Sequence, residues 1–413
     1  MRNLTRSLVS NFRSSHWVLL AAVIAWLISS CSTTEVITAS AKPPIQLQSF
    51  QTGAPRLDVT VIPLDPNLAA LAKANGGEIP VTAEVRHAES RYIAFQLKET
   101  LQQTGNWGIV RMMPTAAQHH QLVITGKILE SDGEKLSVRI TATDATGEIW
   151  LTKIYEDTAS KYAYKTETEE LLREDPFQSL YNVVADDLIQ CYQQYDQTQI
   201  NSVKLTADIA FAANLAPDAF GAYLVTDSQG KVKILQVPAD NDAVRQKVDR
   251  IRNQDDLLVD TFDDYYFNFH KDIASSYYEW RYATYDEAVM LRKGKKEALD
   301  RKLKGAGLLG LALLAGAKSD TYAGDIASVA VAGGAVKIIK SGYDRAAQTE
   351  IHDRALEELT QSLSREVAPS VFDIEGRAIE LTGSAEQQYE QWRQMLRQLY
   401  ESDRGIPQSP TNL

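Results

Sequence analysis

The first thirty residues contain an apolar run that is too short to span a membrane. It covers residues 17–28 and ends three residues before Cys31. A bilayer-spanning helix needs about 20 apolar residues, and this run has about a dozen. Arg2, Arg6 and Arg13 lie before or at its start, and no acidic residue occurs among the first thirty. A basic segment, a short apolar segment and small residues, in that order, predict a cleaved secretory signal and an exported chain.

The residues around the end of this run resemble a known processing site. Ile28-Ser29-Ser30-Cys31 is similar to the lipobox of bacterial lipoproteins, in which a branched apolar residue and two small residues precede an obligatory cysteine. The resemblance implies that Cys31 is lipidated, that residues 1–30 are removed as a signal peptide, and that the new amine is acylated. Ser32, rather than Asp, follows the cysteine. By the rules of that family this implies an anchor in the cell outer membrane, on the periplasmic face.

Charge and cysteine content limit the partners. Residues 1–30 hold three Arg and no acid, so their removal changes the net charge from −11 to −14. This acidity argues against a nucleic-acid partner, whose phosphates need basic patches. If Cys31 is acylated, Cys191 is the only thiol left, and an intrachain disulfide is excluded. Cys191 lies in a helical pattern, and we expect it in the core.

Residues 31–56 are rich in Ser, Thr, Ala and Pro and show no hydrophobic period. They predict a flexible tether. Two dozen extended residues reach at most about 80 Å at about 3.3 Å each. The first folded domain is therefore expected close to the membrane surface.

Residues 57–200 show alternating strand and helix patterns. Strands are predicted at 57–65 and 107–114, and three more within 121–156, joined by turns at Asp132-Gly133 and Asp144–Gly147. A helix with an i, i+4 apolar stripe ends at Gly105, and another begins at Asp175-Pro176, read as an N-cap and a first-turn proline. The predicted fold class is α/β (α+β), a sandwich with a mixed sheet and helices on one face.

Four short motifs in this region carry a resemblance to a family. They are Val59–Pro63, Leu101–Val110, Ile124–Ile128 and Asp144–Trp150. Their order is similar to that of the α/β domain shared by the curli secretion lipoprotein CsgG, the penicillin-binding-protein activator LpoB and the N-terminal domain of TolB. The resemblance implies a domain used for docking and assembly, without an invariant catalytic residue. The chain lacks obvious amphipathic hairpins that would build a transmembrane barrel, and the second half resembles no family.

Residues 201–303 are predicted to be mainly helical and rich in aromatic residues, with a short hairpin at 228–230. One set of apolar residues falls at helical spacing, which favours a buried seam between helices: Phe262, Tyr266, Phe269 and Ile273. The alternative interpretation is a stacking platform for peptidoglycan or polysaccharide, formed by exposed Tyr277, Tyr278 and Trp280.

Residues 304–342 are rich in Gly and Ala and predict a helical hairpin with small-xxx-small spacings. Three interpretations stay open: a buried hairpin, a surface for homo-oligomer formation, and membrane insertion. Both apolar runs are shorter than a spanning helix, and Asp325 interrupts the second. Residues 343–402 predict helices with a short hairpin at 371–383, and Ser384 with Gln387 forms a capping-box pattern. Residues 403–413 are expected to be a disordered tail.

The sequence shows no motif for catalysis, a cofactor or a metal. His119-His120 lacks the third ligand that a metal site needs, and we expect surface histidines. Asp263 and Asp264 are adjacent on a predicted helix and point about 100° apart, which argues against a hydrolase pair. No phosphate loop, nucleophile elbow or dinucleotide fingerprint occurs. We therefore expect a protein that is not an enzyme.

These observations predict a lipid-anchored cell-envelope lipoprotein that acts as an interaction or assembly factor in the periplasm, with an envelope protein as partner. One alternative is an oligomeric subunit of a secretion or export channel. Another is a peptidoglycan- or polysaccharide-binding protein.

Overall fold

The computed structural model describes residues 41–47, 56–74, 81–164, 174–239, 242–314, 370–374 and 377–402. Predictions for Cys31, for the second half of the Gly/Ala-rich hairpin and for residues 343–369 and 403–413 lie outside the described residues. For residues 72–74, 295, 298–314, 370–374, 377–379 and 402 only the backbone is described.

A five-stranded mixed sheet forms the centre of the α/β domain, as predicted. Its strands are β1 (Val59–Val61), β2 (Val110–Met112), β3 (Leu122–Ser131), β4 (Lys135–Asp144) and β5 (Ile149–Thr158), in the order β2-β1-β3-β4-β5. Strand β1 is parallel to β2 and to β3, whereas β3, β4 and β5 form an antiparallel meander. The two predicted turns of the meander contain Gly133 and Gly147, at φ +87° and +78°.

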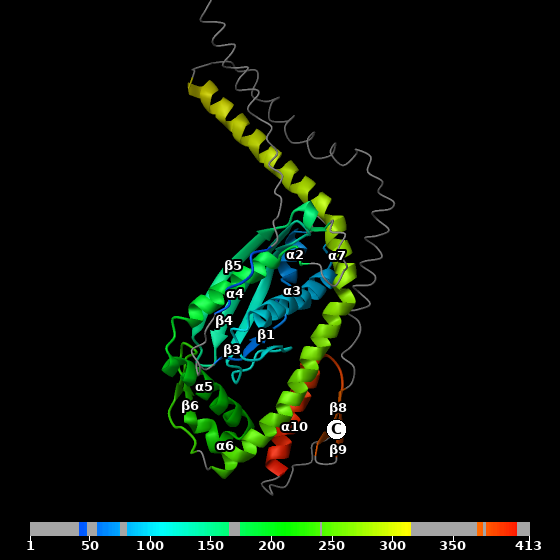
Figure 1. Cartoon of the computed structure of the whole chain (residues 1–413). Coiled ribbons are helices and arrows are strands. Elements are labelled where there is room, and N and C mark those ends of the chain that lie inside the picture. Colours follow the sequence, from blue (N-terminus) through cyan, green and yellow to red (C-terminus); the bar gives the residue numbers. More distant parts are fainter. Residues whose placement is uncertain are drawn as a thin grey trace, which may run out of the picture. The chain divides into compact units, whose positions relative to one another are not determined.

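Helices α3 (Ala83–Thr104) and α4 (Gln178–Tyr192) lie next to each other over the sheet (Figure 1). Helix α3 begins where the Thr82 side chain accepts a hydrogen bond from the Val85 amide, and it ends at Gly105, which adopts the left-handed conformation as predicted. The predicted N-cap of α4 is wrong. The helix starts at Gln178 after Phe177, three residues beyond Asp175, although the Asp175 carboxylate accepts the Phe177 amide at 2.9 Å and also pairs with Arg281.

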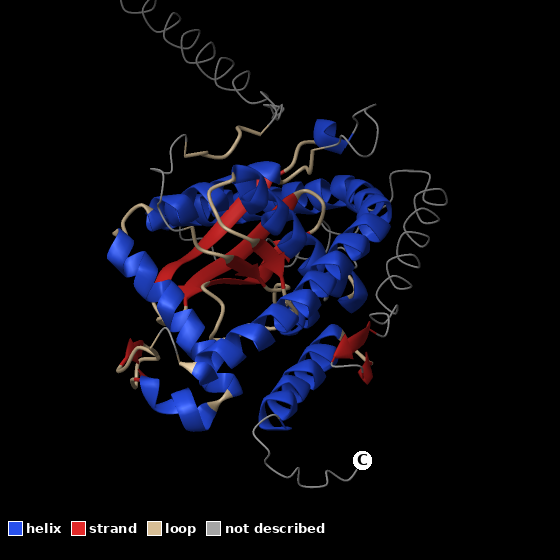
Figure 2. Cartoon of the chain, turned by 60° about the horizontal axis from the view of Figure 1, so that its bottom comes forward, coloured by secondary structure: helices blue, strands red, loops and turns tan. Residues whose placement is uncertain are grey.

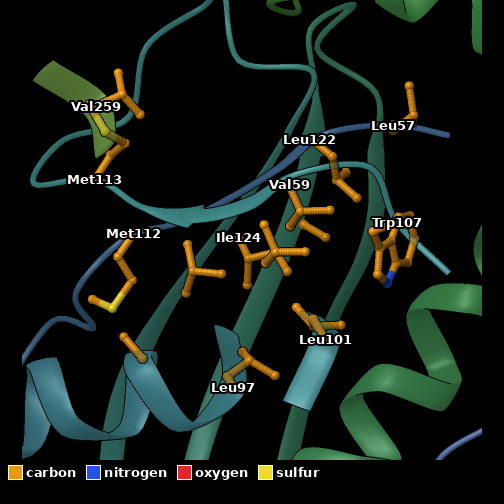
Figure 3. Close-up of a cluster of buried hydrophobic side chains, with 14 of the residues drawn as sticks. Leu57, Val59, Leu97, Leu101, Trp107, Met112, Met113, Leu122, Ile124 and Val259 are labelled. Atoms are coloured by element: carbon orange, nitrogen blue, oxygen red, sulfur yellow. The ribbon is translucent and has the colours of Figure 1, made fainter. Parts of the chain in front are cut away.

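Alternating apolar side chains of the strands fill the space between the sheet and α3. Figure 3 shows Val59 and Ile124 from neighbouring strands facing Leu97 and Leu101 of α3. Along β4, the residues of the buried face are Leu136, Val138, Ile140 and Ala142, while Arg139 between them is exposed. Period-two alternation on a strand with one covered face is what the sequence predicted.

The second half is mainly helical. Its elements are α5 (Gln197–Leu215), α6 (Pro217–Phe220), a 3₁₀ turn η3 (Gly221–Tyr223), the hairpin β6 (Leu224–Thr226) with β7 (Val232–Ile234), the hairpin β8 (Ser370–Ile374) with β9 (Arg377–Leu381), and α10 (Ala385–Ser402). A short helix α2 (Leu68–Ala74) and a 3₁₀ turn η1 (Lys161–Tyr164) belong to the first half. Figure 2 shows β8–β9 beside α10. The predicted capping box is confirmed, since Ser384 and Gln387 each accept the other's amide proton at α10.

One helix dominates this half. Helix α7 (Ala243–Leu314) is continuous over 72 residues, which corresponds to about 108 Å at 1.5 Å per residue. The predicted domain boundaries at 200/201 and 303/304 fall inside α5 and α7. A buried stripe recurs every three or four residues along α7, from Val248 through the predicted seam to Ala288. The seam prediction is confirmed, because Phe262, Tyr266, Phe269 and Ile273 are all buried.

Polar contacts fix the position of α7 along the α/β domain. Asp263 accepts the Met112 amide of β2 at 2.9 Å and pairs with Lys98 of α3 at 2.9 Å. Further along α7, Arg292 pairs with Glu130 at 2.9 Å. It also pairs with Asp132 and Glu134 around the β3–β4 turn. The helix is therefore held at both ends of the sheet.

Between these two positions lies a buried ion pair. Arg281 contacts Asp175 at 2.9 Å, and both side chains are 2% exposed. The Arg281 guanidinium also lies 4.4 Å from the ring centre of Tyr277, and the Tyr92 hydroxyl donates to Asp175 at 3.1 Å. A charge is tolerated in such a place only when it is paired and hydrogen-bonded.

A second buried charge lies beside the first. Glu89 of α3 is fully buried and accepts hydrogen bonds from Ser131 at 2.6 Å and Tyr277 at 3.0 Å, with Arg86 at 3.2 Å. Desolvation raises the pKa of Glu89, and the neighbouring Arg86 opposes that rise. The two clusters join α3, the end of β3 and α7.

Part of the predicted tether is bound to the domain. The Ile45 amide donates to Asp186 at 2.6 Å, and the Lys42 carbonyl accepts from Asn182 at 2.8 Å, both residues of α4. The side-chain amide of Asn106 accepts a hydrogen bond from the Leu47 amide and donates one to the Ile45 carbonyl. The prediction of a flexible tether over 31–56 is therefore wrong for residues 41–47, because the side chains of Asn106, Asn182 and Asp186 bind backbone groups of this segment.

The buried pair should dominate the attachment of α7. We expect Arg281→Ala to lower the free energy of unfolding by about 3–5 kcal/mol, because it leaves Asp175 buried without its partner. Arg292→Ala is the matched control on the same helix. Its partly exposed contacts should contribute about 1 kcal/mol or less each. Urea unfolding of the two variants measures both values, and equal losses would contradict the assignment.

Candidate interaction surface

The face of the sheet opposite the buried one is open to solvent in part. The strand register places one set of side chains on this face: Thr125, Lys127, Arg139, Thr141, Thr143, Thr152 and Ile154. All are partly or fully exposed, and Ile154 retains 47% of its surface. Thr141 and Thr152 lie 3.2 Å apart through their hydroxyl oxygens. We call this set the open face.

The two edges of the sheet differ. At one edge, α7 lies against β2, whose Met112 amide is taken by Asp263. At the other edge, no strand among the described residues pairs with the outer side of β5. Ten residues make β5 about 33 Å long, at about 3.3 Å each. Ile149 and Ile154 are exposed along it, 55% and 47%. A long edge strand with apolar side chains is a template for adding a strand from another chain.

A second candidate is a small cavity where the β2–β3 loop meets the helices. Its lining includes His119, Phe211 of α5, Asp255 of α7, and Tyr389 and Arg393 of α10. The volume of about 20 Å³ has room for about one water molecule, far below the 300–1,000 Å³ of typical ligand pockets. The Asp255 carboxylate accepts a hydrogen bond from the Trp392 indole at 3.0 Å. This cavity therefore belongs to the packing of α10.

The same cavity corrects the expectation of surface histidines. His119 lies 5.3 Å from the ring of Phe211, edge to face, and 3.4 Å from the Tyr389 hydroxyl. His120 packs against His119 at 4.7 Å. Burial lowers the pKa of His119 well below its usual value and that of His120 to about 4. Both rings are therefore neutral packing groups near neutral pH.

The aromatic residues proposed as a sugar platform do not present exposed faces. Tyr277 and Trp280 are 1% and 0% exposed, and their rings stack with centroids 5.9 Å apart. Tyr278 is half-buried against Tyr164 of η1. The prediction that the three are exposed is wrong, because they belong to the same buried stripe of α7 that covers α3 and the β3–β4 turn.

The remaining chemical groups have structural surroundings. The Asp263 carboxylate binds the Met112 amide and the Lys98 ammonium group, as described above. It does not form a carboxylate pair with Asp264. Among the described residues, no group of three or more His, Cys, Asp or Glu side chains is placed to hold a metal ion. Cys191 is half-buried, as part of the packing around the core, and its thiol contacts the Trp150 carbonyl at 3.4 Å.

Sequence reasoning missed the buried charges. A signal existed, since Arg281 lies four residues after Tyr277 and so on the same side of the helix as the aromatic stripe. A cation on a buried stripe predicts a buried anion, although the sequence does not say which one.

No protein-family model, curated protein or solved structure matches this chain. The resemblances given above therefore stay predictions, and the fold is established by the structure itself.

Asp255 gives a prediction with a definite sign. Burial raises its pKa to about 6, against about 3.9 for an unfolded chain. The folded protein holds the Asp255 proton more tightly than the unfolded chain does. The resulting contribution to the free energy of unfolding is fully present below pH 4 and is lost as pH rises through 6. Asp255→Asn keeps the Trp392 hydrogen bond, so the variant should equal the wild type near pH 4 and exceed it near pH 7 by up to about 3 kcal/mol.

The measurement is urea unfolding of both proteins at each pH. The lowered pKa values of His119 and His120 change stability in the opposite direction. Their contribution to the free energy of unfolding is lost as pH falls. They are present in both proteins and cancel in the difference. A difference that does not depend on pH would show that Asp255 is ionised in the folded protein.

Proposed function

We propose that this protein is a lipid-anchored lipoprotein of the bacterial outer membrane that faces the periplasm and acts as an interaction or assembly factor. The observation that carries the proposal is the sequence before Cys31, with its basic residues, short apolar run and two small residues. Acylation at Cys31 would confine the chain to one lipid leaflet and raise its concentration near envelope partners.

The bound segment 41–47 shortens the distance over which the domain can move. Eleven residues separate Cys31 from Lys42, whose carbonyl is held by Asn182. Fully extended, they reach at most about 40 Å. This is about half the reach expected from the sequence, and it supports a factor that works close to the membrane surface.

For the partner we propose an extended segment of another envelope protein that adds to β5. On its outer side, where no described strand pairs with it, β5 supplies backbone donors and acceptors other than the Trp150 carbonyl, which the Cys191 thiol contacts, and Ile149 and Ile154 supply apolar contacts. Lys153 and Glu156 on the same strand are exposed and charged, which limits non-specific pairing of edges.

The anchor is tested on the protein produced in a bacterium with the lipoprotein pathway. Intact-mass analysis should show a chain that begins at Cys31 and carries acyl groups, and Cys31→Ala should abolish both the acylation and the cleavage. Cys191→Ala is the matched control, because it removes the other cysteine and should keep the lipid. A chain that retains residues 1–30 and bare thiols would overturn the anchor.

The partner surface is tested by site-specific photo-crosslinking in cells. A crosslinking residue at Ile154 should give one dominant adduct with an envelope protein. The same residue at Leu257, an exposed position of α7 at 61%, is the control and should not give that adduct. Ile154→Arg combined with a crosslinker at Ile149 should weaken the adduct. Identical adducts at Ile154 and Leu257 would contradict a specific role of β5.

A further inference from the structure

The last part of α7 differs in charge from the rest of the chain. Between residues 293 and 304 six cations occur against two anions, in a protein whose net charge is −11. The cations are Lys293, Lys295, Lys296, Arg301, Lys302 and Lys304. Residues 305–314, the last described residues of the helix, contain only Gly, Ala and Leu, and the uncharged run continues to Ala317 in the sequence. A basic segment directly followed by an uncharged apolar segment is typical of contact with anionic lipid.

The backbone places these two segments in one continuous helix. Arg292 binds Glu130 at the β3–β4 turn, and the same helix continues to Leu314 (yellow in Figure 1). Helical rise gives the apolar end a length of about 15 Å. The hydrocarbon core of a bilayer is about 30 Å thick, so the described part of this segment would reach about half of it. Among the described residues, no helix is long and apolar enough to cross a membrane.

The distribution of charge around the helix favours an end-on contact. At 100° per residue, the six cations fall on all sides, and so do the five leucines between 308 and 314. A helix that lies flat on a membrane needs one apolar stripe and one polar face. A basic collar followed by an apolar tip instead matches headgroups surrounding a helix that enters one leaflet.

We propose that residues 293–314 of α7 bind an anionic lipid surface end-on, with the basic collar at the headgroups and residues 305–314 among the acyl chains. This contact does not require acylation of Cys31.

The test uses the mature chain, exported with a different cleaved signal and carrying Cys31→Ala, so that no lipid anchor is present. We expect it to float with vesicles that contain phosphatidylglycerol and not with vesicles of phosphatidylcholine alone. Binding should weaken with added salt. Replacing Lys295, Lys296, Arg301 and Lys302 by Gln should lower the partition by at least about tenfold.

A matched variant separates a local contact from general electrostatics. Four exposed cations elsewhere are replaced by Gln: Arg139, Lys233, Arg250 and Lys271. This variant has the same net charge as the first and should bind like the parent. An equal loss in both variants, or no binding to the anionic vesicles, would overturn the proposal.

The depth of the contact is read from an environment-sensitive dye. With Cys191→Ser in the background, the dye is attached at Leu311→Cys or, as a control, at Gln229→Cys in the exposed β6–β7 turn. Anionic vesicles should blue-shift the emission at 311 only. The same shift without lipid, together with an oligomer in sedimentation, would show that a second copy covers the end of α7 and would overturn the lipid contact.

Discussion

The attachment of α7 to the α/β domain depends on the buried pair between Arg281 and Asp175. The apolar stripe of α7 provides most of the buried area, but apolar contacts tolerate sliding. A shift of one residue would move Arg281 by about 1.5 Å along the helix and turn it by about 100° away from Asp175. An unpaired charge in that place is costly. The pair therefore selects one register for a helix of 72 residues.

The fit around the β3–β4 turn follows from the same register. Gly133 has φ +87°, and a Cβ at this position would lie 2.4 Å from the Arg281 carbonyl oxygen. The Tyr164 hydroxyl donates to the Gly133 carbonyl at 2.6 Å, and Arg292 binds the acidic side chains around the turn. The glycine thus serves two purposes, since it allows the turn and lets the helix approach the backbone closely. Gly230 has a similar φ of +81° but meets no neighbour, so there the turn alone requires glycine.

The firmly packed and the accessible parts of the molecule are separate. Buried charges, stacked aromatic rings and the histidine cavity all lie in packed contacts between elements, and the buried charges pair as Arg281 with Asp175 and Arg86 with Glu89. The open face carries the outward-pointing side chains of β4 and β5, and the outer side of β5 is the edge of the sheet beyond β4. This separation supports a protein whose rigid framework presents a strand edge to a partner.

The sequence alone determined the local elements. Alternating residues fixed the strands of the meander, Gly105 ended α3, and Ser384 with Gln387 began α10, because these signals act between residues close in the chain. The mixed sheet and the buried aromatic stripe of α7 followed from the same periodicities. Sequence reasoning also predicts an export signal that ends before Cys31, in residues outside the described ones.

Only the tertiary structure decided which surfaces are covered. Periodicity shows that Tyr277 and Trp280 share a helix face, but it does not show that α3 and the β3–β4 turn cover that face. It likewise gave no reason to expect that Asn106 and Asn182 hold residues 42–47, or that Asp175 before α4 pairs with Arg281 of α7. These contacts join residues between about 60 and 140 positions apart. Their partners are selected by burial and charge in the folded chain, which no local pattern records.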